Sequence, residues 1–133
     1  MESSRIKIHN PPTIAPPTGY SHVAELRGGK LVFIAGQVAL DRSGMVVGQD
    51  DYRAQAEQVF KNIGLALASA GGRFDDLVRL TYYVLDVSHL PEVREVRDRF
   101  VNTARPPTST AVQVSRLVRP EFLLEVDAVA SVG

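Results

Sequence analysis

The chain has 133 residues, the length of one ordinary domain, so we expect a single domain over residues 1–133. Its 15 lysines and arginines balance its 15 aspartates and glutamates, and a neutral chain lacks the positive charge typical of nucleic-acid binding. The absence of cysteine excludes disulfides and a thiol nucleophile and favours a cytoplasmic location.

The first third of the chain predicts an arm followed by strands. Residues 1–10, MESSRIKIHN, are polar and lack the apolar segment of a signal peptide, and no apolar run in the chain is long enough to cross a membrane. Residues 10–20, NPPTIAPPTGY, predict an ordered loop or extended arm because they contain four prolines. The strands are predicted as a hairpin through Gly28 and Gly29, then a turn and a short strand: residues 22–27, 30–36 and 40–48.

The middle of the chain contains the clearest helix, within residues 51–72. Apolar residues recur there at the spacing of one helical face: Ala56, Val59, Phe60, Ile63, Leu67 and Ala70. Asp50 or Asp51 is suited to cap the start of this helix, and Gly71 is suited to end it.

The remaining segments predict, in chain order, a strand, a helix and two strands: residues 77–86, 91–100, 110–117 and 122–132. The helix has Pro91 in its first turn. Its inward-facing residues are expected to be Val93, Val96 and Phe100.

The two predicted helices can cover only one face of the predicted sheet. Residues 31–35, LVFIA, and 122–126, FLLEV, are apolar on both faces, as in strands that are buried on both sides. Because the chain offers no third helix, we expect another copy of the same chain to cover the second face. The pattern therefore predicts a homo-oligomer.

Glu125 is the most informative candidate for catalysis. It is a carboxylate in an otherwise apolar strand, and a partly desolvated carboxylate suits a general acid or base. The alternatives are a structural ion pair with an arginine or a solvent-facing stripe shared with Asp127, and the sequence leaves all three open. We expect no metal site, because the histidines lie far apart without ligand spacing: His9, His22 and His89.

Two other polar residues are weaker candidates. Tyr20 lies in the arm, where its phenol either binds a ligand carboxylate or carbonyl or packs the arm on the body. Ser109 lacks the G-x-S-x-G context of an activated serine and fits the start of a strand. Four arginines lie close together in sequence, which is typical of a solvated helix face: Arg94, Arg97, Arg99 and Arg105.

Several segments, in order, resemble the RidA family, also called the YjgF-like or reactive intermediate deaminase family. GYSH resembles the family's arm, and LVFIAGQVALD resembles its second strand and turn. The segment from QAEQVF to PEVREV resembles the stretch from its first to its second helix. RPPTSTAVQVSRL and LLEVDAVA resemble its closing signature and its glutamate-containing last strand. The resemblance covers about residues 15–131.

The resemblance implies an α+β, chorismate-mutase-like fold, in which one mixed β-sheet carries two helices on one face. It also implies a homotrimer with a small-molecule ligand in clefts at the subunit interface, and no cofactor. From the neutral charge and the lack of a long apolar run, we expect no nucleic-acid or membrane partner. Typical members hydrolyse reactive enamines and imines, such as 2-aminoacrylate, to keto acids and ammonia.

The resemblance also implies which residues form the site. Glu125 matches the family's water-activating glutamate, Tyr20 matches its tyrosine, and Gly36 matches the glycine of its Ser-Gly-Gln turn. Four substrate-binding positions depart from the family's serine, asparagine, arginine and cysteine, in that order: Ala35, Arg94, Ser109 and Ala111.

The departure at Ser109 matters most, because the family's arginine there grips the substrate carboxylate. We therefore expect a hydrolase or deaminase of small enamine or imine compounds with a non-standard substrate. The alternatives are a non-catalytic small-molecule-binding trimer and an endoribonuclease or chaperone-like protein. Arg94 and Arg105 are candidates to replace the missing anchor.

Overall fold

The computed structural model describes residues 5–133. Residues 1–4, which begin the polar segment where we expect no signal peptide, lie outside the described residues. The elements in chain order are β1 (Ile6–His9), β2 (Val23–Leu26), β3 (Lys30–Gln37), α1 (Tyr52–Ser69), β4 (Leu77–Val84), α2 (Leu90–Arg97), β5 (Thr108–Gln113) and β6 (Leu124–Val132). Short 3-10 turns precede β4 and α2, at Phe74–Asp76 and Val87–His89.

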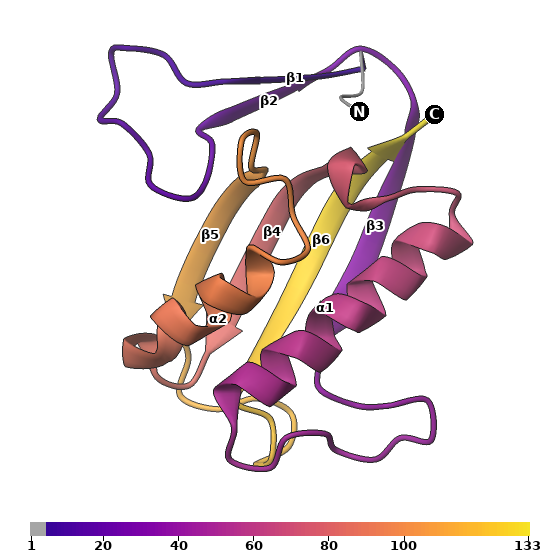
Figure 1. The fold of residues 1–133 in the computed structure, drawn as a ribbon, viewed down its shortest axis with the longest axis vertical. Helices are drawn as coiled ribbons and strands as arrows, with labels where there is room; N and C mark the ends of the chain where they lie inside the picture. The colour runs from indigo at the N-terminus through magenta and orange to yellow at the C-terminus, as the bar shows by residue number, and fades with distance from the viewer. Residues whose placement is uncertain (1–4) are drawn as a thin grey trace.

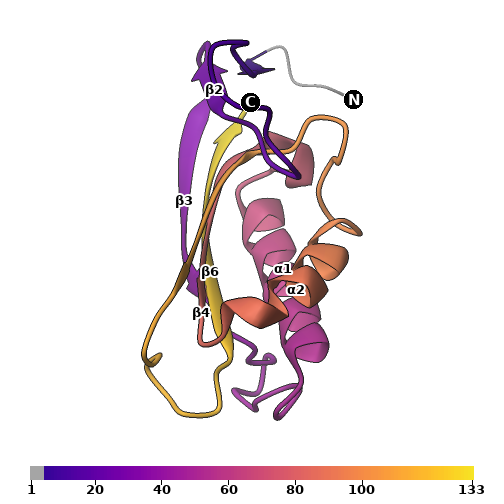
Figure 2. The same cartoon turned by 90° about the vertical axis from the view of Figure 1, so that its left-hand side faces the viewer.

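The main sheet has four strands in the order β3-β6-β4-β5 (Figure 1). β6 is antiparallel to both of its neighbours, whereas β4 and β5 are parallel, so the sheet is mixed. Figure 2 shows α1 and α2 on the same side of this sheet, with the opposite side bare. The predicted α+β arrangement with two helices on one face is confirmed.

The first helix forms where its periodicity predicts. Asp51 caps it by accepting a hydrogen bond from the Ala54 backbone N–H at 3.1 Å, a contact typically worth about 1 kcal/mol. Gly71 follows the helix with φ +79°, the left-handed conformation that ends a helix most easily with glycine. The side chains that α1 buries are Tyr52, Gln55, Ala56, Val59, Phe60, Ile63 and Leu67.

The predicted hairpin between residues 22–27 and 30–36 is wrong. β2 pairs with β1 in a separate two-stranded sheet, in a register that runs from Ile6 opposite Leu26. Gly28 and Gly29 do form a turn, with φ +107° and +90°, but this turn leads the chain from the small sheet into β3. Sequence reasoning missed β1 because it is only four residues long and lies in a polar segment.

The short strand predicted within residues 40–48 is also absent from the described structure. A single bridge joins Leu40 to Val46, around a turn in which the Gly44 N–H donates to the Asp41 carbonyl at 2.9 Å. The predicted turn therefore forms, but the segment after it has no neighbouring strand to pair with.

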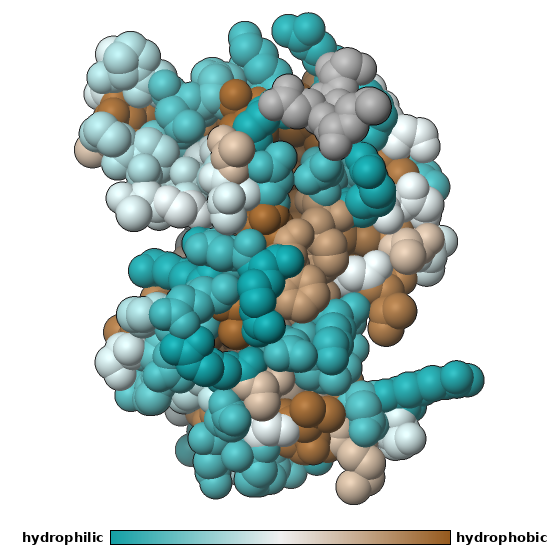
Figure 3. Space-filling model, viewed as in Figure 1, coloured by the Kyte–Doolittle hydropathy of each residue, from teal (hydrophilic) through white to brown (hydrophobic). Residues whose placement is uncertain are grey.

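The hydrophobic core lies between the main sheet and the two helices. The helix-bearing side of the molecule is largely hydrophilic over α2 (Figure 3). On the opposite face, β3 exposes Leu31 and Phe33, whose side chains are 54% and 75% exposed. Residues 31–35 therefore are apolar on both faces, as the sequence indicates, and one of those faces is uncovered in the single chain.

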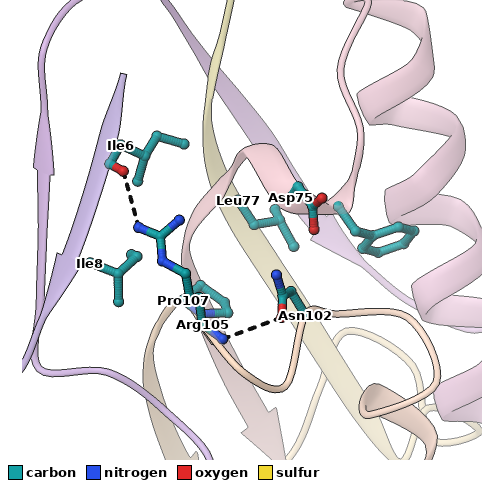
Figure 4. Close-up of a pocket in the computed structure, with 8 residues that line it drawn as sticks. Ile6, Ile8, Asp75, Leu77, Asn102, Arg105 and Pro107 are labelled. Carbon is teal, nitrogen blue, oxygen red and sulfur yellow. Dashed lines mark hydrogen bonds between the residues drawn. The ribbon is translucent and has the colours of Figure 1, made fainter. Parts of the chain in front are cut away.

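Arg105 and the loop around it fix the small sheet to the body (Figure 4). The Arg105 guanidinium donates to the Ile6 carbonyl at 3.2 Å, and its backbone N–H donates to the Asn102 side chain at 3.3 Å. Ser21, at the end of the arm, donates from its backbone N–H to the Pro107 carbonyl at 3.1 Å. These contacts place the arm, and Tyr20 with it, beside the start of β5.

Candidate functional site

Glu125 lies on the open face of the sheet. Along β6, Leu124, Val126 and Ala128 are buried on the helix side, so Glu125 and Asp127 point the other way. Glu125 is half-buried there and makes no hydrogen bond or ion pair with any residue from 5 to 133. Of the alternatives weighed from the sequence, the structural ion pair is therefore not found within the described chain.

A bulge in β3 makes room for the Glu125 carboxylate. Ile34 pairs with Ala128 and Gln37 with Val126, so β3 holds one extra residue between these pairs, where Ala35 and Gly36 lie. A Cβ atom added to Gly36 would lie 2.0 Å from Oε2 of Glu125. Only glycine leaves this space, so Gly36 and the neighbouring Ala35 form one group with Glu125.

The side chains of Tyr83 on β4 and Asp127 on β6 lie next to Glu125 in the sheet. Tyr83 lies opposite Glu125 in the register of these strands, and its hydroxyl donates to Oδ2 of Asp127 at 3.1 Å. This hydrogen bond raises the pKa of Tyr83, because the phenol must lose its contact with the carboxylate to ionise. Asp127 is thus engaged with Tyr83, whereas the Glu125 carboxylate has no such partner.

A second group of candidate residues lies between β5 and α2. Ser109 and Ala111 pair with Leu80 and Tyr82 of β4, whose side chains face the helices. A small cavity on this side is lined by Tyr82, Leu90, Arg94, Arg97, Ser109 and Ala111. The structure therefore brings together three predicted site residues: Arg94, Ser109 and Ala111.

Tyr20 meets Ser109 at the edge of β5. A depression of about 370 Å³ is lined by Tyr20, Ser21, His22, Arg79, Thr108, Ser109 and Thr110. The ring of Tyr20 lies edge-on to His22, with ring centres 5.4 Å apart. Tyr20 thus both packs within the arm and lines a polar hollow, and the two roles weighed from the sequence are compatible.

The candidate residues accordingly form two groups, because β4 lies between β6 and β5, and Glu125 and Ser109 are on opposite faces of the sheet. Glu125, Ala35 and Gly36 form the first group, which we call the β6 group. The second, which we call the β5 group, consists of Tyr20, Arg94, Ser109 and Ala111.

Sequence reasoning missed Tyr82 and placed Arg97 wrongly. Arg97 was expected on a solvated helix face, but it is buried, at 7% exposed, and donates from Nε and Nη2 to Oδ1 of Asp98. The helical spacing could have found it, because Arg97 follows Val93 by four residues on the buried face of α2. Its guanidinium lies so close to Gly19 that a Cβ there would come within 3.0 Å of Nη2.

The other arginines of that run are dispersed. Arg99 donates to Glu57 of α1 at 3.3 Å, and Arg105 is engaged with β1 (Figure 4). Arg105 does not line the cavity between β5 and α2. Arg94 does line it.

Histidine, aspartate and glutamate side chains within residues 5–133 form no group of three or more that could hold a metal ion. Over the same range, no helix is long and apolar enough to span a bilayer.

Comparisons with known proteins define the class of this chain. The family model described as endoribonuclease L-PSP matches residues 10–132. Protein DfrA of Myxococcus xanthus is 38% identical over 130 residues, which span 96% of this chain and 95% of that protein. A RutC family protein of Synechocystis is 32% identical over 87% of this chain and 88% of its own length.

Solved structures agree with this class. The crystal structure of YyfB, a protein of unknown function of the conserved Rid family from Yersinia pestis, matches with a TM-score of 0.89 and 35% identity, over 96% of this chain and 99% of that one. The chain therefore belongs to the Rid/YjgF family, which the matching model describes as endoribonuclease L-PSP. The resemblance read from the sequence is confirmed.

Proposed function

We propose that the protein is a homotrimeric hydrolase of small reactive enamine or imine compounds, with Glu125 as the general base and with active sites between subunits. The observation that carries this proposal is the position of the Glu125 carboxylate. It is half-buried against Gly36 and has no partner within residues 5–133, so it is available to accept a proton.

The proposed reaction needs a base and a water molecule. The substrate enters as the protonated imine, so Glu125 accepts a proton from the water while the oxygen forms a bond to the carbon of the C=N group, which gives a neutral carbinolamine. Glu125 then returns its proton to the nitrogen, and the C–N bond breaks. The hydroxyl proton leaves with the ammonia as ammonium, so a carbonyl product remains, the protein ends unchanged and no cofactor takes part.

The separation of the two groups supports an active site made by two copies of the chain. The β6 group offers the base, whereas the β5 group offers hydrogen-bond donors that suit substrate binding. They lie apart in one chain, and β3 exposes apolar side chains beside the β6 group, which suits contact with a second copy.

The test is hydrolysis of a panel of 2-imino acids, generated from different amino acids by an amino-acid oxidase. We expect the protein to form ammonia and 2-oxo acid from at least one imino acid of the panel faster than spontaneous hydrolysis does. Glu125→Gln keeps the shape and removes the base, so it should lower this rate about 100-fold or more while the trimer stays intact. An intact and fully active Glu125→Gln trimer would refute Glu125 as the base.

The same panel, together with an RNA-binding assay, distinguishes the alternatives. A trimer that only binds small molecules would bind products of the panel without accelerating any hydrolysis. An endoribonuclease would show a salt-dependent shift with RNA. The dispersal of Arg97, Arg99 and Arg105 to separate contacts within the chain argues against a continuous basic surface.

A further inference from the structure

The cavity between α2 and β5 contains an unusual set of side chains. Two arginines, Arg94 and Arg97, line it together with the hydroxyl-bearing residues Tyr82 and Ser109. No carboxylate lines it. All four polar side chains can donate hydrogen bonds, and a set of donors with two positive charges is complementary to an anion.

The hydroxyl of Tyr82 is the strongest sign that a ligand is missing from this arrangement. Tyr82 is only 2% exposed. Burial raises the pKa of Tyr82, whereas the charge of Arg97 and a hydrogen bond from its guanidinium to the phenol lower it. Because a guanidinium can only donate, the hydroxyl hydrogen of Tyr82 has no acceptor within residues 5–133. A buried donor without an acceptor is costly, so such groups usually serve a purpose.

Arg94 is the second charged donor at the cavity, and it is exposed on α2, so its guanidinium can turn towards a ligand. Its guanidinium makes no hydrogen bond or ion pair with any described residue from 5 to 133. Arg97 differs, because Nε and Nη2 are held by Asp98, and this contact fixes the guanidinium at the cavity. Ala111, with its short side chain, leaves the space beside them unfilled.

We propose that this cavity binds a carboxylate of the substrate, with Arg94 and Arg97 as charged donors and with Tyr82 and Ser109 as neutral donors. The cavity volume is about 20 Å³, room for about one water-sized group. One oxygen of a carboxylate can enter it while the rest of the group stays at its mouth, and a ring is excluded. The proposal rests on the proposed function only in identifying the anion as part of the substrate.

This arrangement moves the charged anchor from β5 to α2. Ser109 carries no charge, and the guanidiniums approach from the helix instead. A carboxylate held there lies in a different place from one held by an arginine at position 109, so the preferred substrate differs from 2-aminoacrylate in length or shape. The neighbouring depression, which Ser109 also lines, offers space for the uncharged part of such a molecule.

Binding can be tested without turnover, by NMR titration of the wild-type assembly with 2-oxobutanoate. We expect shifts at backbone amides of α2 and β5, and no such shifts with the neutral ketone 2-butanone. Arg94→Gln should weaken 2-oxobutanoate binding about tenfold, whereas the control Arg99→Gln should leave it unchanged. Equal effects of the two variants, or binding of inorganic phosphate in place of the carboxylate, would overturn the proposal.

Two further variants separate binding from structure. Tyr82→Phe removes the hydroxyl that has no acceptor, so it should keep or raise the melting temperature while it weakens 2-oxobutanoate binding about threefold. Ser109→Asp places an anion in the cavity, so it should raise the melting temperature by about 3–6 °C over Ser109→Asn and abolish binding. A melting temperature of Ser109→Asp at or below that of Ser109→Asn contradicts the proposal. If Glu125→Gln leaves turnover unchanged while 2-oxobutanoate still binds, only the proposed function is refuted.

Discussion

Gly36 and Glu125 show how single residues define the β6 group, which we propose to be catalytic. The sequence predicted both from a resemblance, but only the structure shows why they belong together, because the bulge in β3 places one against the other. Arg97 is the opposite case. Its charge favours a solvated position, but its spacing from Val93 places it on the buried face of α2, where the structure has it.

Gly36→Ala tests the packing of the catalytic group. The added Cβ would lie 2.0 Å from Oε2 of Glu125, so the carboxylate must move. We expect turnover of the imine substrate to fall at least tenfold with the assembly intact, because a displaced base no longer reaches the water. Ala68→Ser, at an exposed position on α1, is the control and should keep most of the activity. Equal activity of both variants would show that the position of Glu125 does not matter.

Ser109 gives a second prediction at this scale. The loss of a charged bidentate contact typically costs about 2–4 kcal/mol, or roughly 30- to 1,000-fold in rate. Hydrolysis of 2-aminoacrylate, generated from serine or cysteine and followed as pyruvate, should therefore be slower by this factor than with an arginine-bearing family member. A matching rate would show that the anchor on α2 serves the same short substrate.

Gln55 shows how the elements are joined. It lies on α1 with 0% exposure, donates to the carbonyls of Gly48 and Glu121 at 3.1 and 2.8 Å, and accepts from the Leu123 N–H at 2.9 Å. It thereby ties the helix to the segment that leads into β6 and so helps to place Glu125. The sequence did not single out this residue, since a glutamine among helical positions gives no sign of its partners.

Replacement of Gln55 by leucine should destabilise the protein. The change leaves buried backbone groups without hydrogen-bond partners, and the expected loss is about 2–5 kcal/mol in the free energy of unfolding. Urea denaturation followed by circular dichroism measures it. Gln49→Leu, at an exposed position before α1, is the control and should change stability by less than about 0.5 kcal/mol.

The strands also show where local patterns stop being informative. α1, β4 and β6 were predicted because their apolar periodicity is long and their caps are clear. The partner of β2 was not, since Gly28 and Gly29 suit any tight turn and cannot say which strands it joins. Strand pairing over long sequence distances depends on the whole fold, and here the arm between β1 and β2 contributes no strand signal of its own.

The uncovered face of the sheet governs the behaviour of the whole molecule. β3 presents Leu31 and Phe33 to solvent in the single chain, next to the carboxylate that we propose as the base. The sequence predicted this second apolar face from strands without alternation, and that physical reasoning agrees with the trimer implied by the family.

Phe33→Glu tests the assembly. Phe33 is 75% exposed in one chain, so a charge there should not unfold the protein but should separate the subunits. Light scattering should give a wild-type mass about three times the 14.5 kDa of one chain and a variant mass near that of a single chain. Val118→Glu, at an 82% exposed position outside the strands, should remain a trimer. A wild-type protein of single-chain mass would contradict the proposed assembly.

The most direct test of a site shared between subunits is complementation of two inactive variants. Glu125→Gln removes the base, and Ala111→Trp fills the cavity beside Ser109. When the two proteins are unfolded, mixed and refolded together, random trimers should contain an intact pair of groups at about a quarter of their interfaces. Imine hydrolysis should therefore recover to about a quarter of the wild-type rate. A mixture no more active than either variant alone, with trimers present, would show that Glu125 and the Ser109 group do not form one site across the interface.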